Sequence, residues 1–227
     1  MKIAVISDVH ANLEALRSVL GEIDAEEIFC LGDLVDYGAQ PNEAIQMVRA
    51  SGAKCLLGNH DWAALTGDTS MFNARPAMAS IWTRKALTRE SADYLRSLPP
   101  ELKTEPGVGA YFTHGSPDDR LWEYVEPRTH SDLFPHYLDK LKVRLVGLGH
   151  THLPYVWSEG GRTVFNPGSV GQPRDGDPRA AFATLTIEAG ACRVEVKRVE
   201  YDVGSASKKI LDAGLPRSFA ERLHSGV

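Results

Sequence analysis

In the segment Lys2-Ile3-Ala4-Val5-Ile6-Ser7-Asp8-Val9-His10, an apolar run rich in Ile and Val leads directly into an aspartate and a histidine. Residues 2–7 alternate little between apolar and polar, which is typical of a strand buried on both faces. Residues just past such a strand lie at the carboxyl edge of an open α/β sheet. The stretch therefore predicts a central strand with Asp8 and His10 at that edge.

The residues that follow continue this pattern as alternating helices and strands. Residues 12–23 have apolar side chains at helical spacing, and Asn12 is expected to be the N-cap rather than a substrate contact. Short strands are predicted over 28–31 and 55–57, and between them a helix over 41–50 that begins at a proline. This alternation indicates an α/β layer structure with right-handed crossovers.

The later half of the chain predicts a return to strands. Helix-like segments over 77–87 and 91–98 indicate a mainly helical insertion at about 62–109. Two strands and an intervening helix are expected next, then four more strands and a closing helix over 205–213. The last two strands, separated by residues 188–191, suggest a hairpin. We expect a single domain over residues 1–227.

The composition is that of a soluble globular protein. The chain has 227 residues, 43% of them hydrophobic and 24% charged, which is enough for one domain with a buried core. The formal net charge of −5 argues against bulk nucleic-acid binding, which needs a basic stripe. No run reaches the ~18 apolar residues of a membrane span, and the N-terminal run is too short for a signal peptide.

The three cysteines, Cys30, Cys55 and Cys192, indicate free thiols and not a disulfide framework. Their number is odd, and the first two lie within apolar runs. No C-x-x-C spacing occurs, so a thiolate zinc site is not expected. We therefore expect a protein of the reducing cytoplasm.

Five short clusters concentrate the residues that could carry chemistry. Each follows an apolar strand-like run, so in an α/β sheet all five converge on one crevice. Five of the eight histidines lie in them, which argues against a scatter of surface histidines. The clusters are Asp8-Val9-His10, Gly32-Asp33, Gly58-Asn59-His60-Asp61, His114-Gly115 and Gly149-His150-Thr151-His152.

The side chains in these clusters suit divalent transition metals. Carboxylate and imidazole ligands without thiolate favour Mn, Fe, Zn, Ni or Co. One site would use mostly Asp and His, and the other Asn and His. A shared carboxylate would hold the two metals ~3.5–4 Å apart, where they clamp phosphoryl oxygens and lower the pKa of water toward ~7.

In this order the five clusters resemble the pattern of the calcineurin-like metallophosphoesterase superfamily, over residues 8–152. The later run Asn166-Pro167-Gly168-Ser169-Val170 is similar to its small, mostly prokaryotic branch of phosphodiesterases and phosphatases. The resemblance implies a layered α-β-β-α sandwich of two mixed sheets flanked by helices, with the metal site at the strand carboxyl ends.

The resemblance also implies roles for the ligands. Two divalent cations are expected, manganese first, with Fe, Zn, Ni or Co as alternatives. Asn59 would in addition contact the substrate. One metal would be held by Asp8, His10 and His152, the other by Asn59, His114 and His150, and Asp33 would bridge them.

The resemblance gives His60 a different role, as the general acid. In the family this histidine faces the leaving-group oxygen and does not bind metal. Asp36 corresponds to an aspartate that orients it, since an imidazole needs an anchor to fix its tautomer. The alternative for Asp36 is a turn carboxylate. Asp61 is expected to cap the following helix or support a ligand.

One departure from the family concerns the substrate. Protein phosphatases of the superfamily have Arg directly after the orienting aspartate, where this chain has Tyr37. A phenol cannot form the two-pronged cationic contact of Arg with phosphate. The expected function is therefore a phosphodiesterase, in which a metal-bridging hydroxide attacks phosphorus. The alternatives are a phosphomonoesterase, a dinucleoside polyphosphate hydrolase or, remotely, a non-catalytic scaffold.

Other residues are candidates for contacts with a small phosphorylated substrate, a phosphodiester or nucleotide. Arg174 could bind a phosphate or be a structural surface residue. The tryptophans Trp62, Trp82 and Trp122 could line the cleft and stack on a nucleobase, or belong to the core. The sequence leaves the oligomeric state open, although the C-terminal hairpin offers a surface for a homo-oligomer.

Overall fold

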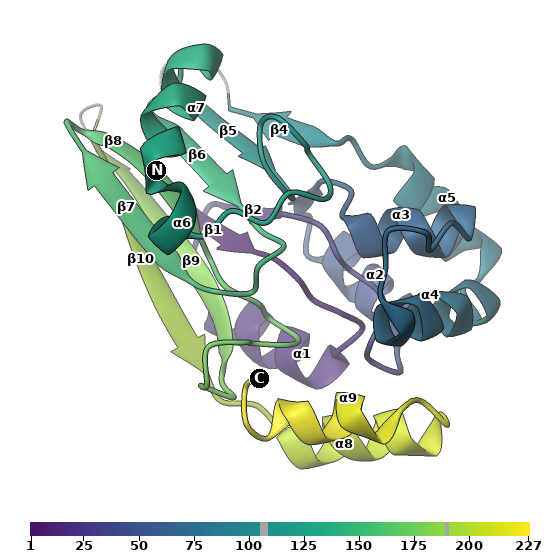
Figure 1. Cartoon of the computed structure of the whole chain (residues 1–227). Coiled ribbons are helices and arrows are strands. Elements are labelled where there is room, and N and C mark those ends of the chain that lie inside the picture. Colours follow the sequence, from purple (N-terminus) through teal and green to yellow (C-terminus); the bar gives the residue numbers. More distant parts are fainter. Residues whose placement is uncertain (105–108, 189–190) are drawn as a thin grey trace.

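The computed structural model describes residues 1–104, 109–188 and 191–227. Two five-stranded mixed sheets form its centre, and helices cover their outer faces (Figure 1). The expected α-β-β-α sandwich is confirmed. Within the described ranges, no helix has both the length and the apolar composition needed to cross a bilayer.

The first sheet is built around the N-terminal strand. Its order is β10-β9-β1-β2-β3, with β1, β2 and β3 parallel and β9 and β10 antiparallel to their neighbours. Ala4 pairs with Ile28 on one side and with Thr184 on the other, so β1 is central. The bounds are β1 (Lys2–Ile6), β2 (Glu27–Cys30), β3 (Lys54–Cys55), β9 (Ala180–Glu188) and β10 (Ala191–Val199).

The second sheet has the order β4-β5-β6-β8-β7. Its three middle strands are parallel, and the two edge strands run antiparallel to their neighbours. Its strands are β4 (Glu101–Lys103), β5 (Ala110–Thr113), β6 (Leu145–Leu148), β7 (Tyr155–Glu159) and β8 (Arg162–Asn166). The carboxyl ends of β5 and β6 lead into His114 and Gly149, as those of β1 and β2 lead into Asp8 and Asp33.

Two hydrophobic clusters, one on each face of the first sheet, explain why β1 lacks alternation. Ile3 and Val5 pack between the sheets with residues such as Phe112, whereas Ala4 and Ile6 pack under the first helices. A third cluster lies under α7 on the outer face of the second sheet. The helices that cover the sheets include α1 (Leu13–Glu22), α2 (Pro41–Ala50), α5 (Arg89–Ser97), α6 (Pro127–His130) and α7 (Phe134–Leu141), with a 3-10 turn over Ser131–Leu133.

The expected helical insertion at about 62–109 needs correction at both ends. Helix α3 (Asn59–Thr66) begins inside the metal-ligand cluster, and α4 (Ala74–Ala86) and α5 follow it. Residues 101–103 are not helical, because they form β4, which pairs with β5 through Leu102 and Phe112. Residues 105–108 of the expected insertion lie outside the described residues.

The C-terminal end has one helix more than the sequence predicted. The expected helix over 205–213 is α8 (Val203–Asp212), and a second helix, α9 (Arg217–Leu223), follows it. Figure 1 shows the two side by side next to α1. Strands β9 and β10 pair as the expected hairpin, while residues 189–190 of its turn lie outside the described residues.

Candidate metal centre

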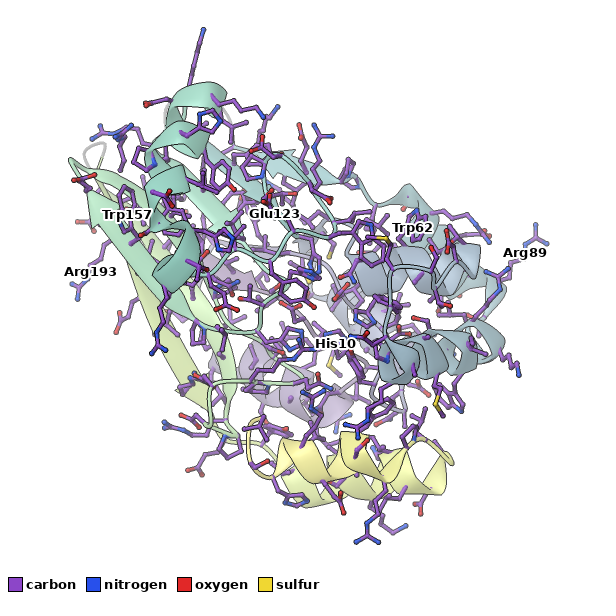
Figure 2. All side chains as sticks on the ribbon, viewed as in Figure 1. His10, Trp62, Arg89, Glu123, Trp157 and Arg193 are labelled. Atoms are coloured by element: carbon purple, nitrogen blue, oxygen red, sulfur yellow. The ribbon has the colours of Figure 1, made fainter. Side chains whose placement is uncertain are left out.

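The structure brings the five clusters together at the carboxyl ends of strands from both sheets. Figure 2 shows His10, which follows β1, in the middle of the molecule. All seven expected ligands are buried. Six of these side chains form two groups, and one carboxylate lies between the groups.

The first group consists of Asp8, His10 and His152, whose ligand atoms lie within 4.8 Å of one another. Asp8 Oδ1 lies 3.2 Å from His152 Nε2 and 3.9 Å from His10 Nε2. These residues come from the loops after β1 and β6. One carboxylate and two imidazoles therefore surround one position.

The second group consists of Asp33, His114 and His150, within the same 4.8 Å limit. Asn59 belongs beside it, because its Oδ1 lies 2.9 Å from His114 Nε2. Asp33 connects the two groups: its Oδ2 lies 3.2 Å from His114 Nε2 and 3.7 Å from His10 Nε2. Asp33 therefore lies between the two groups, with a histidine of each near the same carboxylate oxygen.

Backbone carbonyls fix the tautomers of three of the four histidines in these groups. A carbonyl oxygen only accepts, so each Nδ1 carries the proton and each neutral ring keeps its lone pair on Nε2. The acceptors are the carbonyl oxygens of Val35 for His10 (2.9 Å), Leu31 for His114 (2.7 Å) and Gln172 for His152 (2.5 Å). His150 is the reverse case, because its Nε2 donates to the Trp122 carbonyl at 3.2 Å and leaves Nδ1 free.

In these tautomers, pairs of acceptor atoms face each other inside the site. His10 Nε2 lies 3.0 Å from His152 Nε2, and the lone pairs of two neutral rings repel at that distance. Both oxygens of Asp8 and Oδ2 of Asp33 are buried, and no described residue donates a hydrogen bond to them. Buried anions need a compensating charge. The residues present therefore fit two divalent cations.

The pKa values of the histidines in the site also bear on whether it fits cations. Burial lowers the pKa of His10 and His152 well below the usual value, and lowers that of His150 to about 3, so these rings are neutral ligands. Burial also opposes a charge on His114, but the adjacent Asp33 outweighs it and raises the pKa of His114 to about 9.

The backbone is strained where it presents these side chains. Among the described residues, nine non-glycine residues have positive φ, and all but Lys142 lie in the site loops. Asp8 (55°), Asp33 (54°) and His150 (67°) are examples. Such conformations cost roughly 1–3 kcal/mol each and persist where the surrounding structure enforces them, often at functional sites.

Glycine at position 58 is required by a close approach. A Cβ on Gly58 would lie 2.1 Å from Asp33 Oδ1 and 2.3 Å from Asp33 N. The absence of a side chain lets α3 begin against the bridging carboxylate, where the His60 N–H donates to Asp33 Oδ1 at 2.8 Å. This contact fixes the orientation of the Asp33 carboxylate.

His60 lies beside both groups and belongs to neither. Its ring centroid is 5.0 Å from that of His10, and its Nδ1 lies 2.7 Å from Asp36 Oδ2. The Ser80 hydroxyl of α4 donates to the same Asp36 oxygen. Ser80 lies 44 residues from Asp36, in a helix with no motif of its own, so no local sequence pattern could have identified it.

Asp61 and Asn12 have the structural positions that the sequence favoured. Asp61 accepts the Gly58 N–H at 3.0 Å as part of the α3 capping box, and accepts the Leu34 N–H at 2.9 Å. It therefore holds the loop that follows Asp33. Asn12 caps α1 through the Ala15 N–H at 3.1 Å.

The residues that the sequence suggested as substrate contacts do not all lie together. Arg174 is half-buried, and its Nη2 donates to Gln172 Oε1 at 3.2 Å. Trp62 and Trp122 contact each other, with ring centroids 5.8 Å apart, close to the site. Trp82 instead packs against the hydrophobic cluster under α8 and α9. The structure therefore separates Trp82 from the other candidates.

A family model described as the calcineurin-like phosphoesterase superfamily domain matches residues 1–190. The chain belongs to the calcineurin-like phosphoesterase superfamily. It is a metal-dependent phosphoester hydrolase. Helices α8 and α9 of this phosphoesterase lie beyond the matched residues.

Three known proteins match nearly the whole length of this phosphoesterase, including α8 and α9. An uncharacterised protein of Methanocaldococcus jannaschii is 38% identical over 99% of this chain and 98% of its own. The crystal structure of a metallophosphoesterase from Sphaerobacter thermophilus is 37% identical, covers all of both chains and has a TM-score of 0.84. A hypothetical protein from Pyrococcus horikoshii, 21% identical over 100% of this chain and 98% of its own, shares the fold with a TM-score of 0.89.

Proposed function

We propose that the enzyme is a dinuclear, manganese-dependent phosphodiesterase that acts on small phosphodiesters, with His60 as its general acid. One observation carries this proposal. The His60 ring lies next to that of His10, a proposed metal ligand, but its Nδ1 is hydrogen-bonded to Asp36. A histidine held in this way is positioned for proton transfer rather than for metal ligation.

We assign the proposed ligands to two cations according to the distances between their side chains. Asp8, His10 and His152 would hold one cation, and Asn59, His114 and His150 the other, with Asp33 between them. Bound cations would supply charge stabilisation for phosphoryl oxygens and lower the pKa of water. Carboxylate, imidazole and amide donors without thiolate are compatible with manganese, our first candidate, and also with Fe, Zn, Ni or Co.

His60 would donate its proton from Nε2 to the departing oxygen. Asp36 accepts from Nδ1, which fixes the tautomer and the orientation of the ring. Ser80 anchors Asp36, and Tyr37 packs against the His60 ring with centroids 4.8 Å apart. The ring therefore has fixed neighbours on its Nδ1 side and on one face.

Tyr37 supports a diester over a phosphoprotein. Its ring lies 4.8 Å from that of His10 and 5.1 Å from that of Phe219 in α9. Burial raises the pKa of Tyr37 well above its usual value, so the hydroxyl stays neutral. A neutral phenol can donate one hydrogen bond, which suits the single negative charge of a diester better than a monoester dianion.

Two further side chains are proposed to contact the substrate phosphate. The Asn59 amide can give its oxygen to a cation while its NH₂ group donates to a phosphoryl oxygen. Arg174 is half-buried, and its buried Nε has no hydrogen-bond partner among the described residues. Its charge acts on His152 and Tyr37, which supports a role for the guanidinium beside the site.

A specific observation also favours a second candidate, the dinucleoside polyphosphate hydrolase. Arg222 of α9 lies with Cζ 6.0 Å from the centre of the Tyr37 ring. Burial, and then repulsion from Arg174 and Arg75, lowers its pKa. Positive charge from Arg222 and Arg174 therefore acts near Tyr37, in a chain whose net charge is −5, and a polyphosphate would neutralise this local charge.

A substrate panel with added Mn²⁺ tests the two candidates. The protein is stripped of metal, reconstituted and assayed on an aryl phosphodiester, an aryl phosphomonoester and a dinucleoside polyphosphate. The proposal expects the highest kcat/KM for the diester. A preference for the polyphosphate would support the second candidate, and a preference for the monoester would reject both.

The cysteines support a cytoplasmic location. Cys30 and Cys55 are paired positions on β2 and β3 and are both buried as free thiols. Neighbouring thiols that remain reduced are typical of a reducing compartment. We infer the cytoplasm as the site of action.

A further inference from the structure

A row of aromatic side chains extends outward from His60. The Phe72 ring stacks on His60 with centroids 4.5 Å apart and planes 27° apart. Trp122 meets Phe72 edge-on at 5.3 Å, and Trp62 meets Trp122 at 5.8 Å. These rings come from α3, from the loop before α4 and from the loop after His114. Segments distant in sequence therefore contribute to one aromatic surface.

A second contact brings this surface to the metal ligands. The Tyr124 ring lies 3.9 Å from the His150 ring, with planes 38° apart. Tyr124 is 50% exposed, and its near neighbour Trp122 supplies the carbonyl that holds His150 Nε2. The aromatic surface thus borders both the proposed acid and one proposed metal position.

These rings are not part of the hydrophobic core. Phe72, Trp62 and Trp122 are half-buried, and none belongs to a described hydrophobic cluster. The other two tryptophans behave differently: Trp82 packs against the cluster under α8 and α9, and Trp157 against the cluster under α7. Figure 2 shows Trp62 and Trp157 on opposite sides of the molecule. Core packing therefore explains Trp82 and Trp157, but not Trp62 and Trp122.

The loop that carries Trp122 and Tyr124 is held in place by its own hydrogen bonds. Asp119 Oδ1 accepts the Trp122 N–H at 3.1 Å, and the Gly115 N–H donates to the Arg120 carbonyl at 2.7 Å. The Tyr155 hydroxyl donates to the Val125 carbonyl at 3.3 Å. The two aromatic rings are therefore presented by a preorganised loop, which reduces the entropy lost on binding.

The loop that carries Phe72 is held similarly. The Phe72 N–H donates to the Thr69 carbonyl at 2.9 Å, and Asp68 Oδ1 accepts the Ser70 N–H at 2.9 Å. Met71 beside it is 65% exposed. Phe72 nevertheless turns inward onto His60, so its position depends on the site and not on the core.

We propose that Phe72, Trp122 and Tyr124 form a subsite for a planar aromatic group of the substrate, such as a nucleobase, on the leaving-group side of the site. This inference rests on the proposed role of His60, which would place the departing oxygen beside Phe72. Stacking on aromatic side chains recognises the face of a planar ring and tolerates differences in its edge. The subsite therefore selects phosphoesters of aromatic alcohols and nucleosides over those of simple sugars.

Two ligands that differ in the base alone test this subsite. Adenosine 5′-monophosphate and ribose 5-phosphate present the same phosphate to the Mn²⁺-loaded enzyme, and their competitive inhibition constants are measured against bis(4-nitrophenyl) phosphate. We expect the nucleotide to bind about tenfold or more tightly than the sugar phosphate, the size of one stacking contact. Equal affinities in the wild-type enzyme would overturn the proposal.

Matched tryptophan variants locate the effect. Trp122→Ala should reduce the affinity ratio to within about twofold, whereas Trp122→Phe should keep most of it, since a ring remains. Trp157→Ala, on the far side, should leave the ratio unchanged. A ratio that survives Trp122→Ala in protein with its full metal content would contradict the subsite.

The same ligands separate failure of the subsite from failure of the proposed function. If the enzyme does not hydrolyse the diester, the two affinities are measured by titration calorimetry, which requires no turnover. A nucleotide preference would then support the subsite even though the phosphodiesterase proposal had failed. Turnover of the diester without any preference for the nucleotide would reject the subsite alone.

Discussion

His60 Nδ1 lies 2.7 Å from Asp36 Oδ2, and the Ser80 hydroxyl donates to that same carboxylate oxygen. Asp36 is fully buried, whereas the His60 side chain is 6% exposed. The carboxylate is thus fixed by a helix outside the metal loops, and the imidazole is fixed by the carboxylate. The orientation of His60, the proposed acid, therefore depends on Asp36 and Ser80, which come from two other segments of the chain.

Replacing Asp36 by Asn should slow turnover without removing metal. The amide can present its NH₂ group to Nδ1, which favours the tautomer that lacks a proton on Nδ1 and removes the fixed orientation of the ring. We expect kcat to fall about 10- to 100-fold, part of the ~10²–10⁴-fold that a positioned acid contributes. KM should change little. Steady-state kinetics and metal analysis of the same preparation check this.

The control for that variant is Asp139→Asn, a carboxylate paired on the surface with Arg162. It should leave kcat unchanged. If Asp36→Asn turned over as fast as this control, Asp36 would be only a turn carboxylate.

The shared position of Asp33 predicts that its loss affects both metals. Asp33 Oδ2 lies within 3.7 Å of a histidine from each group, whereas Asp8 lies in one group. Asp33→Asn should lower the affinity for both cations and abolish turnover, and Asp8→Asn should weaken one. Metal content by mass spectrometry at graded Mn²⁺ concentrations measures this, and identical losses in the two variants would reject the bridge.

Metal removal should lower stability while the fold persists. The buried oxygens of Asp8 and Asp33 have no described hydrogen-bond donor, so a cation stabilises the folded state. Mn²⁺ at 100 times its Kd would add about 2.7 kcal/mol, or about 5–10 °C in Tm for a domain of this size. Calorimetry with chelator and with Mn²⁺ measures the shift. An unchanged Tm, together with binding of no metal, would argue against the centre.

Gly58→Ala should disrupt the centre through backbone sterics alone. The new Cβ would overlap Asp33 Oδ1 and Asp33 N, and overpacking of this kind costs about 1–3 kcal/mol. We expect lower Mn²⁺ affinity and lower stability by chemical denaturation. Gly21→Ala in α1 is the control, because nothing lies within 4 Å of its Cβ. That change should stabilise the protein by about 0.5–1 kcal/mol, and equal effects of the two variants would contradict the account.

The metal centre was predictable because its residues follow strands whose burial pattern is visible in the sequence. Asp8 and His10 are expected past β1, and the structure brings both to the site with His152. The positive φ of Asp8 and His10 was not predictable, since nothing in a single sequence reports strain at non-glycine residues. Tertiary contacts hold these conformations.

Contacts between segments that lie far apart in the sequence were less predictable. Ser80 reaches Asp36 from α4, and Phe72 reaches His60 from a loop with no periodic pattern. Residues 101–103 form β4 only because β5 offers a free edge. In each case the partner lies elsewhere in the chain, so local pattern carries no signal.

The most direct measurement of the central claim compares leaving groups in His60→Ala. The variant and the wild-type enzyme, each with two Mn²⁺ per chain, are assayed on an alkyl phosphodiester and on a 4-nitrophenyl phosphodiester. Because alkoxide needs a proton and 4-nitrophenolate does not, the account predicts a loss of about 10²–10⁴-fold in kcat/KM for the alkyl ester and a much smaller loss for the aryl ester. Equal losses for both esters, or no loss, would contradict the assignment of His60 as the general acid.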